Sequence, residues 1–306
     1  MKRKIDYVKQ AFREGNLYPK LICYFLEKIG LSSETIRRLQ LRNYYYRKLK
    51  KEYYSKIDQE VIDLKLRQGN NIVWFFWDDG LENAPQLVKR CYANLKKFKP
   101  TGYEVVLLNK SNMEEYVDIP QYVLDKYRRG CIPSANFSDI LRLLLLVQYG
   151  GIWMDATVYL SSNLDDFKNL DQMFVFSNEY RNDDIINFDN WFIVAKPNNL
   201  LLKKTLNLLL MYWKKENVLR EYFICHLFFK MVTEKYPQEW EDTNKLTTLL
   251  PHSLYHMQYE VFNKEKLKKD FELCCVHKMS YKNLHTNYKN TYLDAVMKGI
   301  TYEDLC

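Results

Sequence analysis

The chain has 306 residues, 47% hydrophobic and 27% charged, which suits one large globular domain or one domain with an appendage. Nine glycines and eight prolines argue against a disordered or fibrous protein. Of the net charge of +8, residues 1–68 hold 17 Lys and Arg against 8 acidic residues, and the remainder holds 29 against 30. The near-neutral main body lacks the basic stripe of a nucleic-acid binder, so we expect no nucleic acid as partner.

Residues 1–68 are expected to form a basic helical N-terminal extension. Apolar residues recur at helical spacing over 18–31, and Ser32 or Ser33 is placed to cap a second, tyrosine-rich helix that continues to residue 67. Such helices either dock on an anionic membrane surface or pack as a solvated pair on the main domain, and the sequence leaves both open.

From residue 69 to 306 the pattern indicates an α/β domain, because strand-like and helix-like segments alternate. Strands are expected at 72–77, 103–109, 152–160, 172–179, 190–197 and within 271–283. Helices are expected at 84–98, in short pieces around Pro120, at 134–150 and across 198–236.

The seven cysteines, at 23, 91, 131, 225, 274, 275 and 306, form no CxxC pair, as is typical of reduced thiols in a cytoplasm. We expect the adjacent Cys274 and Cys275 to be buried at a strand. No signal peptide and no run of about 18 apolar residues is present, so a cytoplasmic protein is expected, peripheral at the inner face of the cell membrane if the N-terminal helices dock there.

Asp155 stands out because it lies in the apolar segment IWMDATVYL, where an unpaired carboxylate is costly to bury. If 152–160 is one strand, Asp155 and Thr157 share a face near its carboxyl end, the end at which open α/β sheets bind ligands. A hard divalent cation shared with a diphosphate would suit that carboxylate.

The preceding helix places Asp139 and Arg142 on one face, since they are three residues apart. They form either a structural ion pair or a sugar-binding Asp with an Arg beside it. Gly150 and Gly151 then end the helix and turn the chain into the strand.

The segment SDILRLLLLVQYGGIWMDATVYL, residues 138–160, resembles the sugar-binding DXD region of glycosyltransferase family 32, particularly its capsular polysaccharide synthesis branch. The matching residues are Ser138, Asp139, Arg142, Gly150, Gly151 and Asp155. Thr157 stands where the family has its second acidic residue, and the resulting DAT is similar to the variant that the capsular-synthesis branch carries. The resemblance covers roughly residues 70 to 285 and implies the GT-A fold, a Rossmann-like sheet that binds nucleotide sugars.

The resemblance also implies a metal and a phosphate site. Asp155, Thr157 and His277 would hold Mn²⁺ or Mg²⁺, while Asp139 and Arg142 would orient the sugar. Lys278, Ser280 and Lys282, in the polar turn after a late strand, would contact the phosphates. For His277 alone a structural role is the alternative.

Aromatic residues complete the expected site. By position in the family, Trp77 would stack on the nucleotide base, with core packing as the alternative and Trp74 as the core candidate. For the acceptor we single out Asp189 and Asn190, just before a strand, and Tyr222 and His226, four residues apart on a helix. For that last pair an aromatic core is the alternative to an acceptor wall.

These expectations describe a retaining glycosyltransferase that moves a sugar from a nucleotide diphosphate, with UDP preferred over GDP, to a hydroxyl. The acceptor would be a capsular or other surface polysaccharide precursor, such as a lipid-linked oligosaccharide. No residue stands out as a covalent nucleophile, so front-face attack assisted by the leaving phosphate is the working mechanism. The alternative is a membrane-associated, catalytically inactive binding protein with a transferase-like body.

Overall fold

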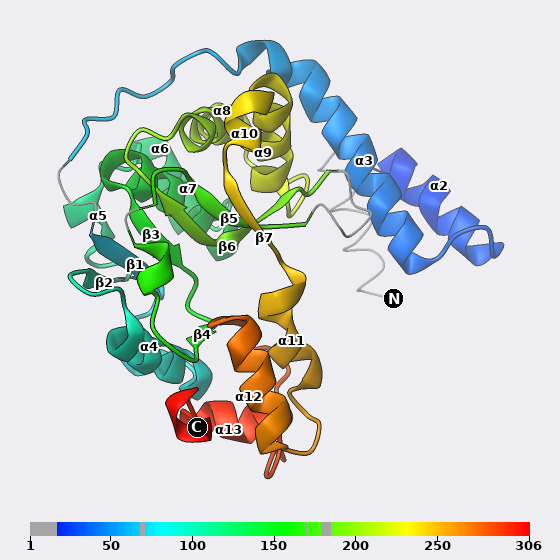
Figure 1. The fold of residues 1–306 in the computed structure, drawn as a ribbon. Helices are drawn as coiled ribbons and strands as arrows, with labels where there is room; N and C mark the ends of the chain where they lie inside the picture. The colour runs from blue at the N-terminus through cyan, green and yellow to red at the C-terminus, as the bar shows by residue number, and fades with distance from the viewer. Residues whose placement is uncertain (1–16, 68–70, 169, 179–184) are drawn as a thin grey trace.

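The computed structural model describes residues 17–67, 71–168, 170–178 and 185–306. Its centre is a six-stranded mixed sheet (Figure 1). In spatial order the strands are β2 (Glu104–Leu108), β1 (Ile72–Phe76), β3 (Gly151–Met154), β6 (Phe188–Ala195), β5 (Phe174–Ser177) and β7 (Asn244–Thr247). The α/β class expected from the sequence is confirmed.

The pairing directions bring three strand ends together. β1 runs parallel to both β2 and β3, whereas β6 is antiparallel to β3 and β5, and β7 is parallel to β5. The carboxyl ends of β1, β2 and β3 therefore lie at one edge of the sheet, where open α/β sheets bind ligands.

Helices cover both faces of the sheet. On one face α7 (Ser134–Tyr149), α8 (Leu200–Lys215) and α9 (Ile224–Lys235) form the largest apolar core with side chains such as Trp74 and Trp153. On the other face α4 (Gln86–Phe98) packs over Phe75 and Ile152. Shorter helices connect these elements: α5 (Met113–Tyr116), α6 (Gln121–Arg128) and α10 (Pro237–Glu241). The long helical pattern at 198–236 is thus two helices with a break between them.

The helix α7 ends at a tight glycine turn, as expected. Gly150 caps it with a positive φ of 70° and donates its N–H to the carbonyl of Leu146. A Cβ at Gly150 would lie 2.7 Å from the carbonyl oxygen of Ala195, so only glycine fits at this junction.

The expected strand 152–160 is interrupted at Asp155. β3 ends at Met154, and β4 (Val158–Leu160) leaves the main sheet and pairs antiparallel with β8 (Val276–Lys278). Between them a turn is closed by the N–H of Val158, which donates to the carbonyl of Asp155 at 3.0 Å. Asp155 and Thr157 thus lie in a turn and not along one strand face.

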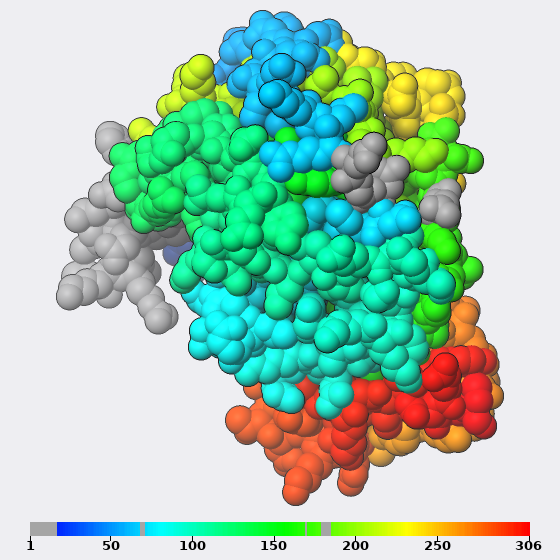
Figure 2. Space-filling view, turned by 90° about the vertical axis from the view of Figure 1, so that its left-hand side faces the viewer, coloured from blue at the N-terminus to red at the C-terminus, as the bar shows by residue number. Residues whose placement is uncertain are grey.

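The C-terminal helices form a third core that the sequence patterns did not identify. α11 (Leu249–Met257), α12 (Lys264–Leu273) and α13 (Tyr292–Lys298) pack together with Leu87 and Cys91 of α4 and with Tyr159 of β4. Figure 2 shows this group, in orange and red, at one end of the molecule. Residues 271–273 belong to α12, so the expected strand within 271–283 is only the short β8.

The N-terminal helices are α2 (Leu17–Lys28) and α3 (Glu34–Tyr53), the latter capped by Ser33, whose Oγ accepts the N–H of Ile36. The helical expectation was wrong for 57–67, which forms no helix. Along α3, Tyr53 packs on Phe228 of α9, with ring centroids 5.2 Å apart, and Lys50 pairs with Glu234 at 2.5 Å. The second half of α3 is therefore part of the main core, whereas α2 projects outward (Figure 1).

Candidate functional site

Asp155 lies at the carboxyl edge of the sheet because the chain turns directly after β3. Its N–H donates to the carbonyl of Trp191 on β6 at 2.8 Å, which ties the turn to the neighbouring strand. The Asp155 side chain is 27% exposed, so the carboxylate is accessible from solvent.

Two cations and an indole hold the Asp155 carboxylate. Arg142 approaches Oδ1 at 3.2 Å, the Trp153 Nε1–H donates to the same oxygen at 2.9 Å, and Lys278 donates to Oδ2 at 3.0 Å. Burial alone would raise the pKa of Asp155, but the charges of Lys278 and Arg142 outweigh it and hold the pKa below its ordinary value. Asp155 is therefore ionised at neutral pH.

Arg142 is buried and fixed from several sides. It donates to Ser138 Oγ at 3.2 Å and to the carbonyl of Asn190, and its guanidinium lies 5.1 Å from the ring of Trp153. Its Nη2 is also 3.4 Å from Asp139 Oδ1. The expected pairing of Asp139 and Arg142 is confirmed, and Asp155 extends it.

Asp139 is buried beside Arg142 and accepts the Asn190 side-chain N–H at 2.8 Å. Burial raises the pKa of Asp139 to about 6, with Arg142 opposing the rise and the Asp155 carboxylate adding to it. Asp139 thus titrates near neutral pH, unlike Asp155.

An irregularity in β6 presents Asn190 to this cluster. The register between β5 and β6 shifts between Val175, which pairs with Ile193, and Phe176, which pairs with Asp189. A bulge of this kind redirects side chains. Asn190 reaches Asp139, whereas Asp189 accepts hydrogen bonds from Asn178, at 2.7 Å, and from Thr248. Of the neighbouring acceptor candidates Asp189 and Asn190, the structure brings only Asn190 to Asp139 and Arg142.

The side chains of consecutive residues of β8 point to opposite faces of the strand. Lys278 donates to Asp155 at 3.0 Å and to Thr157 Oγ1 at 2.8 Å. His277 is fully buried, with Nε2 3.0 Å from Ser161 Oγ and Nδ1 3.6 Å from Asp270. Burial lowers the pKa of His277 to about 3, so the imidazole is neutral. The expectation that His277 shares a site with Asp155 is corrected: strand alternation turns it into the C-terminal core.

The residues present therefore do not fit the expected divalent metal. Such an ion requires several oxygen or nitrogen ligands around one point. Asp155 already accepts from two cations, Thr157 is bound by Lys278, and His277 faces away. Across the described ranges, no group of three or more His, Cys, Asp or Glu side chains is arranged to hold a metal.

Aromatic and polar side chains border the cluster. The half-buried Trp77 meets Tyr281 edge-to-face, with centroids 5.3 Å apart, which places Trp77 beside the turn that follows Lys278. In that turn the N–H of Lys282 donates to Ser280 Oγ at 3.2 Å, and the Lys282 side chain is exposed. Trp74 is fully buried and donates to the carbonyl of Gly150 at 3.0 Å, which confirms it as the core tryptophan.

Tyr222 and His226 separate in the structure. Tyr222 is 56% exposed, and partial burial, with the Asp139 and Asp155 charges adding to it, raises its pKa. His226 is buried between the rings of Phe188 and Phe223, and burial lowers its pKa to about 4. The aromatic-core alternative therefore describes His226, and only Tyr222 is accessible.

Two residues that border the site were not identified from the sequence. Tyr281 packs on Trp77, and Trp191 presents its ring 5.7 Å from Lys278. Tyr281 stands within the polar turn already singled out for its lysines, so an exposed aromatic there was a usable signal. Trp191 reads as an ordinary strand residue, and nothing in the local sequence marks it.

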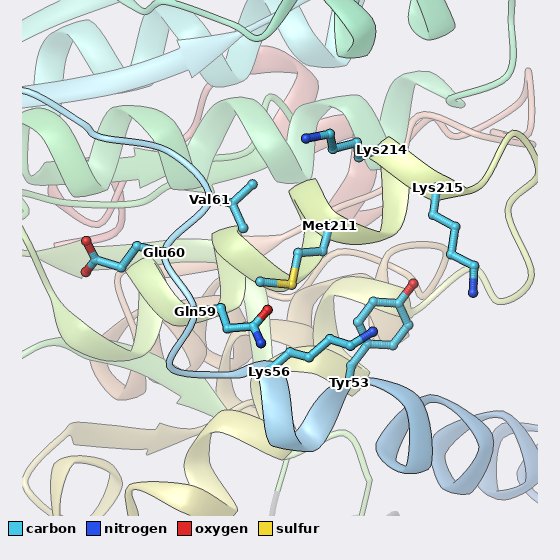
Figure 3. Close-up of a pocket in the computed structure, with 8 residues that line it drawn as sticks. All are labelled: Tyr53, Lys56, Gln59, Glu60, Val61, Met211, Lys214 and Lys215. Carbon is cyan, nitrogen blue, oxygen red and sulfur yellow. The ribbon is translucent and has the colours of Figure 1, made fainter.

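A hollow of the described chain lies away from these residues. Figure 3 shows this space of about 370 Å³, whose lining comes from α3, the segment after it and α8. Its lining residues are Tyr53, Lys56, Gln59, Glu60, Val61, Met211, Lys214 and Lys215, none of which belongs to the Asp155 cluster. The Asp155 turn lies apart from this hollow, at the carboxyl edge of the sheet.

Similar sequences include two fungal proteins. The chain is 32% identical over 102 residues to "O-glycosyltransferase braB" of Annulohypoxylon truncatum, which is 31% of this chain and 24% of that protein. It is 32% identical over 101 residues to "Glycosyltransferase afumC" of Aspergillus fumigatus, 30% of this chain and 26% of that protein. The chain thus spans about a quarter of the length of the curated relatives it matches.

Among solved structures, "PaToxG Glycosyltransferase" aligns over 89% of this chain and 97% of its own, with 15% identity and a TM-score of 0.38. The model of the family described as "Capsular polysaccharide synthesis protein" matches residues 28–296. The match starts well before residue 70, so α3 belongs to the family region, contrary to the narrower resemblance expected. The chain therefore belongs to the capsular polysaccharide synthesis protein family.

Proposed function

We propose that this protein is a retaining glycosyltransferase that moves a sugar from a nucleotide diphosphate donor, UDP-linked by preference, to a hydroxyl of a surface polysaccharide precursor. The observation that carries the proposal is the solvent-accessible Asp155 carboxylate held between Arg142 and Lys278 at the carboxyl edge of the sheet. Family membership and the glycosyltransferase names of the two similar fungal proteins support it.

The reaction requires stabilisation of the negative charge that develops on the leaving group. The departing diphosphate gains negative charge as the anomeric C–O bond breaks, and cations fixed in advance stabilise that charge most effectively. Lys278 is 19% exposed and held in place by Asp155 and Thr157, so it is poised to contact the phosphates. Ser280 and the exposed Lys282 follow in the same turn and extend the polar surface.

Sugar and base would bind on either side of these phosphates. Asp139 and Asn190, linked at 2.8 Å and braced by Arg142, offer a carboxylate and an amide for sugar hydroxyls. Trp77, with Tyr281 against it, provides an aromatic surface for the flat base. The exposed Tyr222 would face the acceptor.

We also propose that α2 docks the enzyme on an anionic membrane surface, where a lipid-linked acceptor would be found. Apolar residues are exposed at helical spacing along α2 and directly after it: Tyr18, Leu21, Ile22 and Phe25 in the helix and Ile29 next to its end. Residues 17–56 hold ten Lys and Arg against three acidic residues, which complements anionic lipid. Within the described chain no helix combines the length and apolar character needed to cross a bilayer.

The test is release of free nucleotide diphosphate from a panel of UDP- and GDP-sugars, run once with Mn²⁺ and once with EDTA. Release from one donor that disappears in Asp155→Ala supports the enzyme. Silence with every donor under both conditions contradicts it and favours the alternative, a membrane-associated binding protein with a transferase-like body.

A further inference from the structure

Lys278 occupies the place where the sequence predicted a metal ion. Its ammonium lies 3.0 Å from Asp155 Oδ2 and 2.8 Å from Thr157 Oγ1, so one cation bridges two of the three expected metal ligands. The β4–β8 pairing fixes this arrangement, because Lys278 stands opposite Val158 in the register. The strand pairing therefore holds the Lys278 backbone beside the turn that carries Asp155 and Thr157.

The surrounding residues suit an ammonium better than a divalent ion. Within the described chain no group of three or more His, Cys, Asp or Glu side chains is placed to hold a metal, and Asp139, the carboxylate that shares Arg142 with Asp155, is braced by that guanidinium. A neutral hydroxyl in place of a second carboxylate also lowers the negative charge that attracts a doubly charged ion. One carboxylate and one hydroxyl are, by contrast, sufficient acceptors for a lysine.

We propose that Lys278, held by Asp155 and Thr157, replaces the divalent metal as the cation that binds the donor diphosphate, so that sugar transfer proceeds without a metal ion. The proposal rests on the glycosyltransferase activity proposed above and adds how that activity handles the phosphates.

The contacts of Lys278 leave its ammonium able to bind a phosphate. Of its three ammonium N–H groups, two are taken by Asp155 and Thr157 among the described residues, and the third remains for a phosphate oxygen. Arg142 contacts the other oxygen of Asp155 and offsets its negative charge. The Asp155 carboxylate therefore repels an incoming diphosphate less. The face of Trp191, 5.7 Å from the ammonium, further favours a fixed cation.

The step balances without any added reagent. The anomeric C–O bond to the β-phosphate breaks and its electron pair stays on the phosphate oxygen. The acceptor hydroxyl oxygen forms the new bond to the anomeric carbon on the same face, and its proton passes to the departing phosphate. Lys278 remains protonated throughout and contributes only charge and a hydrogen bond.

The first experiment measures wild-type turnover and UDP binding, once with EDTA at about millimolar concentration and once with Mn²⁺. Calorimetry measures the binding of UDP. We expect turnover to change by less than about threefold and UDP to bind in EDTA. Turnover that EDTA abolishes and Mn²⁺ restores would overturn the role of Lys278 while leaving the transferase intact. Absence of turnover in both conditions would instead overturn the proposed activity.

The second experiment uses Lys278→Met, which keeps the stem and removes the charge, with Lys269→Met on α12 as the matched control at an exposed lysine. We expect Lys278→Met to lose about 10²- to 10³-fold in kcat, as for the loss of one preorganised donor, and about tenfold in UDP affinity measured in EDTA. Unchanged UDP affinity in folded Lys278→Met, checked by circular dichroism, would contradict the proposal. If Lys278→Met fails to fold, the EDTA comparison on the wild type still decides.

Discussion

The two sides of strand β8 handle charge in opposite ways. On one side Lys278 meets an ionised carboxylate at a surface open to solvent, and the pKa of Asp155 is held low by Lys278 and Arg142 despite its burial. On the other side His277 is sealed in the C-terminal core, where burial keeps it neutral. Adjacent residues on one strand thus differ in charge because of what each side of the strand faces.

We place the chemistry on the Lys278 side of β8. A buried neutral imidazole bonded to Ser161 contributes packing and a satisfied hydrogen bond. A partly exposed ammonium locked between Asp155 and Thr157 is available to an anionic ligand. The predictions below test this division between a functional side and a structural side.

The largest effect is expected for Asp155→Asn. The neutral amide no longer anchors Lys278 and Arg142, so the cations that stabilise the departing phosphate lose their position, and kcat should fall by at least about 10³-fold. Nucleotide release is the measurement, with Asp166→Asn, a nearby exposed aspartate, as the control. Activity within tenfold of wild type would place the reaction away from Asp155.

A smaller, pH-dependent effect is expected at Asp139. Its pKa rises from 3.8 to about 6 in the folded protein, so kcat/KM should fall about fivefold between pH 6 and pH 5 if the ionised form binds sugar. In Asp139→Asn this acid limb should vanish and the plateau should be lower. An unchanged limb in the variant would assign it to another group.

The raised pKa of Asp139 also predicts the sign of a change in the free energy of unfolding with pH. Because the folded pKa of Asp139 is raised, its contribution is fully present below pH 3.8 and is lost as the pH rises through about 6. Asp139→Asn should therefore gain stability relative to wild type between pH 4 and pH 7, on the order of 3 kcal/mol. Denaturant unfolding of both proteins across that range measures the difference, and a difference that does not vary with pH would contradict the raised pKa.

The projecting helix α2 should affect membrane binding and leave the sheet edge intact. Replacing both Leu21 and Phe25 by Asp removes two exposed apolar groups and adds two negative charges. Sedimentation with phosphatidylserine-containing vesicles should show binding reduced about tenfold or more. Leu273→Asp, an exposed leucine on α12, should bind as wild type does; equal loss in that control would show that α2 is not the docking surface.

The smallest catalytic effect is expected for His277→Gln, because the imidazole lies on the structural side of β8. Turnover should stay within about threefold of wild type. Since burial lowers the folded pKa to about 3, below the unfolded 6.5, the wild-type contribution is present above pH 6.5 and is lost as the pH falls. By pH 5 the wild type should lose about 2 kcal/mol that the variant does not lose. Abolished turnover in a folded variant would return His277 to the active site.

Much of the central sheet was predictable, because its strands are apolar runs separated by helices with clear periodicity. The interruption at Asp155 was not, since an apolar run on both sides of one carboxylate reads as a continuous strand. Only the pairing of β4 with β8, more than a hundred residues later in the chain, reveals that 158–160 belongs to a second sheet.

The site was predictable only where its residues are close together in the sequence. Asp139 and Arg142 are local to one helix, so their spacing predicted the contact. His277 and Lys278 were both expected at the site, and only the pairing of the three-residue strand β8 shows which of them faces Asp155, because so short a strand gives no alternation in the sequence. Asn190 reaches the cluster through an irregularity in β6 that no sequence pattern marked.

The central claim is that the Lys278 ammonium, fixed by Asp155, meets the donor phosphates. A crystal structure of the protein with UDP, grown once with EDTA and once with Mn²⁺, tests it directly. The account predicts a phosphate oxygen within about 3 Å of Lys278 Nζ in both crystals, with the Lys278–Asp155 contact retained. A metal ion bound to Asp155 between protein and phosphates, with Lys278 turned away, would contradict it.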